Sequence, residues 1–381
     1  MAPRSIYETE DLAAIRALTR RFVEEEVTPK ADPWEEEGVP REVLRRMGDI
    51  GFFGLRVPED RGGIGMGPLA SLVFAEELGR STFGGFSATA IVHTDLAMPY
   101  LLNFGGEHLW DRYLPGSLTG EIIGAIGVTE PDAGTDVAGM RTTATRDGEG
   151  YRLNGSKMYI TNGINADVVY VAAKTNPTAK PSRGISIFAI DRGTGGFGVS
   201  RALKKMGWRS SDTALLTFDD CWVPEAQLVG DLDKGFYAIM ANFQNERLVL
   251  GGMALGESQK AIELTIDYVK NRRAFGASLW TKQRIRLRLA ELQAKVEAGR
   301  QLTYHAGWLM EQGVDATREV SMVKAFVGEL VNEVLYACTQ FHGGMGFIQE
   351  TAIERMYRDA RIHSIGGGAT EVMLEEIAKR S

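Results

Sequence analysis

The segment Thr129–Asp136, which reads TEPDAGTD, concentrates residues that could bind a ligand or move a proton. It follows an apolar run that is predicted to be a buried strand, and it holds two hydroxyl groups and three carboxylates. The same residue types are also strong turn formers, and composition alone favours a long hairpin loop. The segment is therefore a candidate ligand loop, with a structural hairpin as the alternative.

The segment Gln340–Gly346, which reads QFHGGMG, is a second candidate and lies at the end of a long predicted helix. One glycine after a helix commonly serves as its C-cap. Three glycines within four positions indicate in addition that a ligand approaches the backbone where a side chain would block it.

Other common motifs are absent, or the predicted secondary structure around them does not fit their function. Residues Gly193–Gly198 (GTGGFG) fit the spacing G-x-G-x-x-G, but a strand follows them instead of a helix N-terminus, so we predict a turn. The chain has no P-loop, G-x-S-x-G or H-E-x-x-H motif, which argues against phosphoryl transfer, serine hydrolysis and zinc proteolysis. No metal site is predicted, because the histidines are scattered, at positions 93, 108, 305, 342 and 363.

The hydrophobic pattern divides the elements that carry these segments into three parts. Helical spacing in the first third predicts helices that end before Pro29 and at Gly51, and one that begins at Pro68. Long helices return near 236–271, 283–312 and 317–342, with a shorter one from Glu371. Between these parts, short β-branched runs separated by turn residues predict strands at 122–128, 141–146, 151–153, 168–173, 185–190 and 214–218.

This pattern predicts an α+β fold with three domains. We expect an N-terminal helical domain at 1–120, a central small β-barrel domain at 121–234 and a C-terminal four-helix bundle at 235–381. Strands and helices do not alternate, which argues against a doubly wound nucleotide-binding fold.

Composition restricts the class of partner. The 381 residues carry a net charge of -7, which argues against nucleic acid or an anionic membrane as the main partner. Two distant cysteines, Cys221 and Cys338, give no disulfide framework and suit a reducing compartment. We expect a cytoplasmic protein, because no apolar stretch is long enough to span a membrane and the N-terminus shows no secretory signal.

Five segments in order resemble motifs of the acyl-CoA dehydrogenase family. Thr129–Asp136 resembles the T-E-P-x-A-G-S-D signature, with Thr135 in place of the serine. Residues 153–163 (LNGSKMYITNG) resemble L-N-G-x-K-x-x-I-T-N-G, and residues 272–276 (RRAFG) resemble R-x-x-F-G. Gln340–Gly346 is similar to Q-x-x-G-G-x-G, and residues 245–248 (NERL) resemble a helical E-R-L segment found in the long-chain and isovaleryl branch.

The resemblance implies that flavin adenine dinucleotide (FAD) binds between the sheet domain and the C-terminal helices. The residues implied on the flavin side are Ile126, Val128, Thr129, Thr135, Tyr159, Thr161, Thr370 and Glu371. A neighbouring subunit would hold the pyrophosphate and adenosine part, which implies an oligomer, in the family usually a homotetramer built as a dimer of dimers. The residues implied for that part are Arg272, Phe275, Gln283, Gln340 and Gly344.

The implied reaction is α,β-dehydrogenation of an acyl-CoA thioester, with electron-transferring flavoprotein as the acceptor of the electrons. Most members carry the catalytic glutamate in the C-terminal loop, where this chain has Gly367. The resemblance therefore implies that Glu246 is the base and that the Gly367 N–H polarises the thioester carbonyl. Thr135, Gln244, Arg247 and Gly368 are implied to contact the substrate, and Glu371 is the next candidate for the base.

The sequence does not decide which acyl-CoA is the substrate. The likeness to the long-chain branch favours medium-to-long acyl chains, and the small residues at 84, 85, 87, 88 and 90 would either line a roomy acyl pocket or allow close helix packing. The alternatives are a short branched-chain enzyme such as isovaleryl-CoA dehydrogenase, an acyl-CoA oxidase and a non-catalytic DNA-binding flavoprotein of the same fold. The oxidase is disfavoured by the length of the chain and the DNA-binding protein by its charge.

Overall fold

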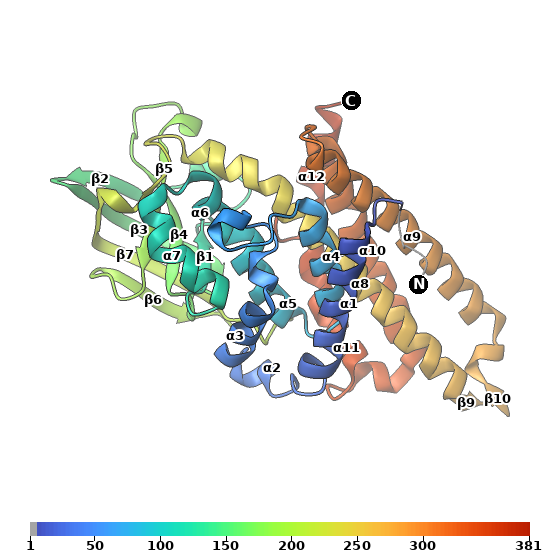
Figure 1. Ribbon diagram of the computed structural model, residues 1–381. Coiled ribbons are helices and arrows are strands. Elements are labelled where there is room, and N and C mark those ends of the chain that lie inside the picture. Colours follow the sequence, from blue (N-terminus) through green and yellow to red (C-terminus); the bar gives the residue numbers. More distant parts are fainter. Residues whose placement is uncertain (1–5) are drawn as a thin grey trace.

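The computed structural model describes residues 6–381 and shows a helical part, a sheet and a second helical part in the order of the chain (Figure 1). The helical–sheet–helical architecture predicted from the sequence is confirmed. The domain limits at residues 120 and 234 stay predictions. The expectation about a secretory signal rests partly on residues 1–5, which lie outside the described residues. No helix within 6–381 is both long and apolar enough to cross a membrane.

The N-terminal helices begin and end where local signals predict. The Thr9 side chain accepts a hydrogen bond from the Leu12 N–H at the start of the first helix, and Gly51 adopts a left-handed conformation (φ 92°) after the third. Pro68 occupies the first turn of the fourth helix, whose residues are almost all buried. The helices are α1 Glu10–Phe22, α2 Trp34–Glu37, α3 Arg41–Ile50, α4 Pro68–Gly79, α5 Gly84–Ile91, α6 Met98–Phe104 and α7 Glu107–Thr119.

The central sheet runs in the order β6-β7-β3-β2-β4-β5-β8, and β1 pairs in parallel with β4. One hydrophobic cluster joins residues of β3 and β7 to residues of β4 and β5, so the sheet curls around a core of its own. The other face of β4 and β5 packs against α6 and α7. The strands are β1 Gly124–Gly127, β2 Thr143–Asp147, β3 Gly150–Thr161, β4 Val168–Lys174, β5 Ile185–Asp191, β6 Phe197–Ala202, β7 Thr213–Pro224 and β8 Leu228–Val229.

Two details of the sheet test the sequence reading. The first four residues of the glycine-rich segment, 193–196, lie in the turn between β5 and β6, and Phe197 and Gly198 begin β6, so the segment is a turn followed by a strand as predicted. Strand β3 is longer than predicted, because the turn-forming pair Asn154-Gly155 is accommodated as a register shift inside the strand, with Gly155 at φ 147°.

The C-terminal helices are dominated by α8, which crosses the molecule from the sheet to the small hairpin β9–β10 (Figure 1). Helices α8, α9 and α10 share one core with α4. Helix α11 was not predicted, although α12, which is also nine residues long, was. The elements are α8 Gly235–Asn271, β9 Arg273–Ala274, β10 Ala277–Ser278, α9 Gln283–Glu311, α10 Thr317–His342, α11 Ala352–Ala360 and α12 Thr370–Ala378.

Glycines bring α8 into close contact with its neighbours. A Cβ atom on Gly251 would lie 2.5 Å from Val323 on α10, and one on Gly252 would lie 2.7 Å from Leu72 on α4. Because such distances exclude any larger residue, these glycines allow α8 to lie close to α4 and α10. Close packing here fixes the turn of α8 that carries Glu246.

Candidate active site

The carboxylate of Glu246 is buried on α8, and the residue is only 6% exposed. The Asn242 side chain, one turn earlier on the helix, donates a hydrogen bond to Glu246 Oε1 at 3.0 Å. Burial raises the pKa of Glu246 to about 7, although the hydrogen bond from Asn242 and the charge of Arg247 act to lower it. A carboxylate with a pKa near neutrality is suited to accept a proton at physiological pH.

The segment Val92–Ala97, a π-helical turn before α6, closes the site from the N-terminal side. Asn242 and Asn245 both donate to the backbone carbonyl of Asp95, at 3.3 and 3.0 Å. The fully buried Tyr100 lies near the same group, and burial together with the charge of Glu246 raises its pKa. The neighbouring Asn242 side chain acts in the opposite direction and lowers the pKa of Tyr100.

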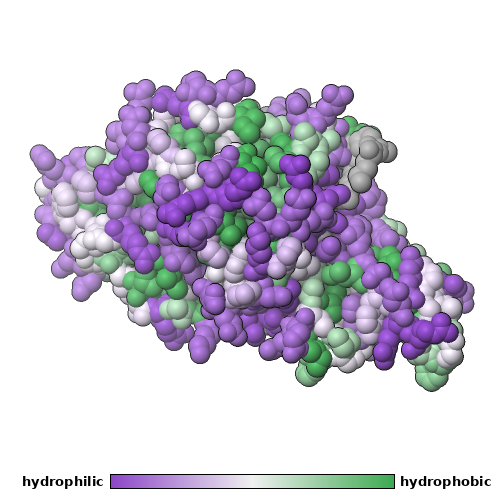
Figure 2. Space-filling model, turned by 60° about the horizontal axis from the view of Figure 1, so that its bottom comes forward, coloured by the Kyte–Doolittle hydropathy of each residue, from purple (hydrophilic) through white to green (hydrophobic). Residues whose placement is uncertain are grey.

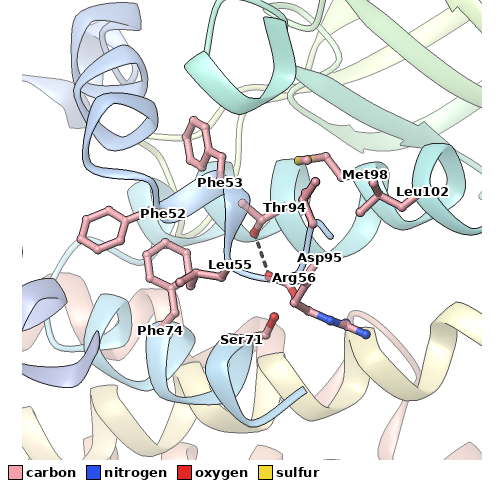
Figure 3. Close-up of a pocket in the computed structure, with 11 residues that line it drawn as sticks. Phe52, Phe53, Leu55, Arg56, Ser71, Phe74, Thr94, Asp95, Met98 and Leu102 are labelled. Atoms are coloured by element: carbon pink, nitrogen blue, oxygen red, sulfur yellow. Dashed lines mark hydrogen bonds between the residues drawn. The ribbon is translucent and has the colours of Figure 1, made fainter. Parts of the chain in front are cut away.

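A small cavity adjoins this turn on the side of the N-terminal helices. Figure 3 shows Asp95 and Arg56 on one side of it and aromatic rings on the other. The Thr94 hydroxyl donates to Asp95 at 2.7 Å, and Arg56 donates to the side chain of Asn245. Polar contacts from two other elements therefore hold the α8 turn next to Glu246 in place.

The loop 363–368, which lies just before α12 and is called the glycine loop below, packs against the same turns of α8. A Cβ atom on Gly367 would lie 2.6 Å from Leu250, one turn beyond Glu246, and Arg247 Nε donates to the Gly367 carbonyl at 3.4 Å. A Cβ atom on Gly368 would lie 3.6 Å from Arg247 Nε. The structure thus brings the predicted loop residues Gly367 and Gly368 against Arg247 and Leu250, which follow Glu246 on α8.

The end of β1 and the end of β3 form a second surface. The Met158 N–H donates to the Thr129 carbonyl at 2.8 Å, which places Tyr159 and Thr161 beside the end of β1. Tyr159 is 63% exposed and adopts a left-handed backbone conformation at φ 62°. Strained backbone of this kind persists where the surroundings require it, often at ligand sites. Of the residues implied here, Val128 is buried, whereas Ile126, Thr129 and Thr161 are half-buried.

In the loop Thr129–Asp136, the buried Glu130 has a structural role. Its carboxylate pairs with the buried Lys157 at 2.7 Å and accepts a hydrogen bond from the Thr142 N–H at 3.0 Å. Lys157 also donates to the Val128 carbonyl, so this ion pair fixes the end of β1. Thr135 is exposed and accessible to a ligand.

Three other residues predicted to contact the cofactor or the substrate lie at the start of α12 or on α8. Thr370 starts α12 and donates to Glu329 at 2.7 Å, and Glu371 in the same turn is exposed. Gln244 is half-buried on α8, with its amide 3.5 Å from Asp315. These side chains border the site but do not contact Glu246.

A third group of predicted residues lies at the far end of α8. About 38 Å of helix separates Glu246 from Asn271 at a rise of about 1.5 Å per residue. Figure 2 shows hydrophobic residues among hydrophilic ones at the right-hand end of the molecule, where β9 and β10 lie in Figure 1. Phe275 is 95% exposed there. The exposed residues of this group are Arg272, Phe275, Gln283, Gln340 and Gly344.

The small residues of α5 favour the packing interpretation over the pocket interpretation. A Cβ atom on Gly84 would lie 2.6 Å from the Trp208 ring, and one on Gly85 would lie 2.5 Å from the Ser211 backbone. All residues of α5 are buried. Gly84 and Gly85 therefore allow α5 to pack against the loop before β7.

Three family descriptions match successive parts of the chain: "Acyl-CoA dehydrogenase, N-terminal domain" at 9–121, "middle domain" at 125–221 and "C-terminal domain" at 233–381. The chain belongs to the acyl-CoA dehydrogenase family. Long-chain specific acyl-CoA dehydrogenase from Sus scrofa is 41% identical over 96% of this chain and 85% of its own length. Isovaleryl-CoA dehydrogenase from Pongo abelii is 36% identical over 96% and 87%. A solved acyl-CoA dehydrogenase from Geobacillus kaustophilus is 39% identical, with TM-score 0.94 and 99% of both chains covered.

Acyl-CoA dehydrogenases depend on FAD, and a solved FAD complex of PigA has TM-score 0.94 to this chain at 28% identity. The residues present fit that cofactor. Strand β1 is paired on one side only, by β4, which leaves backbone donors and acceptors at its other edge within the described chain. The exposed ring of Tyr159 beside that edge provides an apolar surface for a planar ring system. The chain is an FAD-dependent oxidoreductase.

Two residues that the sequence reading missed take part in this geometry. Asn242 bonds to Glu246, and its position four residues earlier on a predicted helix could have indicated the contact. The side chain of Lys324 on α10 donates a hydrogen bond to the Gly368 carbonyl in the glycine loop. Lys324 lies 43 residues before Gly367 in the sequence, and no local sequence pattern indicates this contact.

Proposed function

We propose that this acyl-CoA dehydrogenase removes the α proton of an acyl-CoA thioester with Glu246 while a hydride leaves the β carbon, which yields a trans-2-enoyl-CoA. The observation that carries the proposal is the buried Glu246 carboxylate, with a pKa near 7, on the part of α8 whose Arg247 and Leu250 meet a glycine loop that has no side chain at position 367. FAD, when bound, supplies the hydride acceptor. The N–H of Gly367 donates to the thioester oxygen as negative charge develops there.

The Thr129, Tyr159 and Thr161 surface is proposed to hold the flavin ring, with Ile126, Val128 and Thr135 around it. Arg247, Gln244 and Gly368 are proposed to meet the CoA part of the substrate. The Arg247 guanidinium is partly buried over the Phe243 ring, 5.2 Å from its centroid, and points to the loop side of α8 rather than to Asn242. It is therefore placed for a phosphate or amide of the ligand.

The far end of α8 is proposed to serve the active site of a neighbouring subunit. One cofactor that touches the sheet near Glu246 cannot also reach Arg272 of the same chain, because about 38 Å of helix lies between them. The exposed Phe275 and Phe347, at 95% and 87%, suit a surface that another subunit covers. We propose a homotetramer built as a dimer of dimers.

Electron-transferring flavoprotein is the proposed acceptor of the electrons. A relative 36% identical to this chain, from Acetobacterium woodii, is named a subunit of a caffeyl-CoA reductase–Etf complex. Recombination of the reduced enzyme with purified electron-transferring flavoprotein, followed by the absorbance of both flavins, tests this partner.

The proposed substrate range is medium-to-long straight acyl chains, and its support is the long-chain relative at 41% identity. In anaerobic mixing with a panel of acyl-CoAs, we expect faster bleaching of the flavin with chains of eight or more carbons than with isovaleryl-CoA. Faster bleaching with isovaleryl-CoA would favour the branched-chain alternative, which the relative at 36% identity supports. No bleaching with any thioester would refute dehydrogenation itself.

Replacement of Asn242 by Leu is expected to shift the pH dependence of flavin reduction to higher pH. The amide of Asn242 stabilises the carboxylate form of Glu246, so its loss raises the pKa of Glu246 above 7. The rate of flavin reduction, followed from pH 6 to 9, should then rise along an acid limb displaced by at least about half a pH unit. An unchanged limb would contradict the assignment of Glu246 as the titrating base.

A further inference from the structure

Lys324 is buried in α10, 2% exposed, and its ammonium contacts the glycine loop. Its Nζ donates to the backbone carbonyls of His363 and Gly368, the second at 3.0 Å. In the part of the chain that the structure describes, no carboxylate forms an ion pair with it. Burial, with the nearby charge of Arg247, lowers the pKa of Lys324 to about 8. A buried ammonium of this kind is retained only where its hydrogen bonds compensate for lost hydration.

The two carbonyls that Lys324 binds stand at the two ends of the loop 363–368. Gly367 and Gly368 adopt φ values of 70° and 116°, which glycine reaches without steric cost, so contacts from outside the loop are needed to hold one conformation. Arg247 binds the Gly367 carbonyl from the other side, and His363 is anchored to Glu257 on α8 at 2.9 Å. The direction of the Gly367 N–H is therefore set by side chains outside the loop.

We propose that Lys324 is a positioning residue that aims the Gly367 N–H at the thioester carbonyl of the substrate. This proposal rests on the proposed function and names a residue on which its oxyanion site depends. Lys324 does not touch the substrate. By binding the carbonyls before and after Gly367, it restricts the rotation of the peptide planes between them, and a fixed donor stabilises developing negative charge better than a mobile one.

The test measures carbonyl polarisation directly, with 3-ketooctanoyl-CoA as a probe that ionises to an enolate without turnover. In the flavin-loaded parent, we expect the bound probe to ionise at lower pH than the free probe, as read from the ultraviolet absorbance of its own enolate. In Lys324→Met, the ionisation constant of the bound probe should fall at least about tenfold, and flavin reduction should slow by a similar factor. Flavin content should stay that of the parent.

Asn332→Leu is the matched control. Asn332 lies on the same helix and donates to the backbone carbonyls of Gly328 and Ala360, at 2.8 and 3.2 Å, but it does not contact the glycine loop. We expect this variant to lose thermal stability while probe ionisation stays that of the parent. An equal loss of ionisation in Asn332→Leu and Lys324→Met would overturn the proposal, because general loosening of α10 would then explain both.

Lys324→Gln provides a second variant if Lys324→Met does not fold, since an amide can still donate to one of the two carbonyls. Ionisation between that of the parent and that of Lys324→Met supports the positioning role. Ionisation and rates equal to the parent in a folded Lys324 variant overturn it. A parent that neither ionises the probe nor reduces its flavin with any acyl-CoA refutes the proposed function instead, so the two failures are distinguishable.

Discussion

Glu246→Gln is expected to bind FAD and acyl-CoA as the parent does and to reduce its flavin at least about a hundredfold more slowly, the low end for loss of a general base. Glutamine keeps the size of the side chain and can still accept the hydrogen bond from Asn242, but it cannot take the α proton. Anaerobic stopped-flow mixing with a good acyl-CoA measures the effect. Asp267→Asn, an exposed carboxylate near the end of the same helix, serves as the control and should leave the rate unchanged.

The same substitution should stabilise the protein above neutral pH. Between the ordinary pKa of 4.5 and the folded value of about 7, the folded state keeps a proton on Glu246 that the unfolded state releases. Stability therefore falls as pH rises through this range, by on the order of 3 kcal/mol in total. We expect Glu246→Gln to unfold at a higher temperature than the parent at pH 8, and the difference to vanish near pH 4.5.

Gly367→Glu, added to Glu246→Gln, should restore part of the lost rate, because position 367 lies beside Leu250, one turn from Glu246. Recovery should be incomplete, since Gly367 has φ 70° and a Cβ atom there would displace the Leu250 side chain. If Glu246→Gln alone reduces its flavin as fast as the parent, the base is another residue, and Glu371→Gln is the next variant to measure.

Two inactive variants, Glu246→Gln and Arg272→Ala, should recover activity when the two chains are produced together. If each site combines the Glu246 half of one chain with the Arg272 half of its neighbour, random assortment makes about a quarter of the sites fully intact. Alone, Arg272→Ala should lose flavin, because arginine binds a pyrophosphate through paired hydrogen bonds. Flavin content and turnover of the co-produced oligomer measure the recovery.

The control for this experiment is a chain that carries both substitutions, produced together with the parent chain. A site shared between subunits again gives about a quarter of intact sites, whereas a site within one chain gives about half. Recovery that does not exceed the sum of the two variants purified separately would contradict the shared site.

Local signals in the sequence were enough to locate most of the architecture. Pro68 and Gly51 mark helix ends through the restricted geometry of proline and the left-handed freedom of glycine, and both lie where predicted. The exceptions are also local in origin. Asn154-Gly155 resembles a turn but is accommodated inside β3, and α11 was missed although α12, of the same length, was predicted.

By itself, the sequence determined the class of fold and the family motifs in their order, because these depend on neighbouring residues. It also made Glu246 the candidate base, because the glycine at position 367 has no side chain that could serve. Only the tertiary structure showed that Gly84 and Gly85 allow close packing of α5 and that Lys324 contacts the glycine loop. It also decided the pKa of Glu246. A pKa depends on how much water is excluded and on which dipoles face the group, and segments more than a hundred residues away, such as Val92–Ala97, supply both.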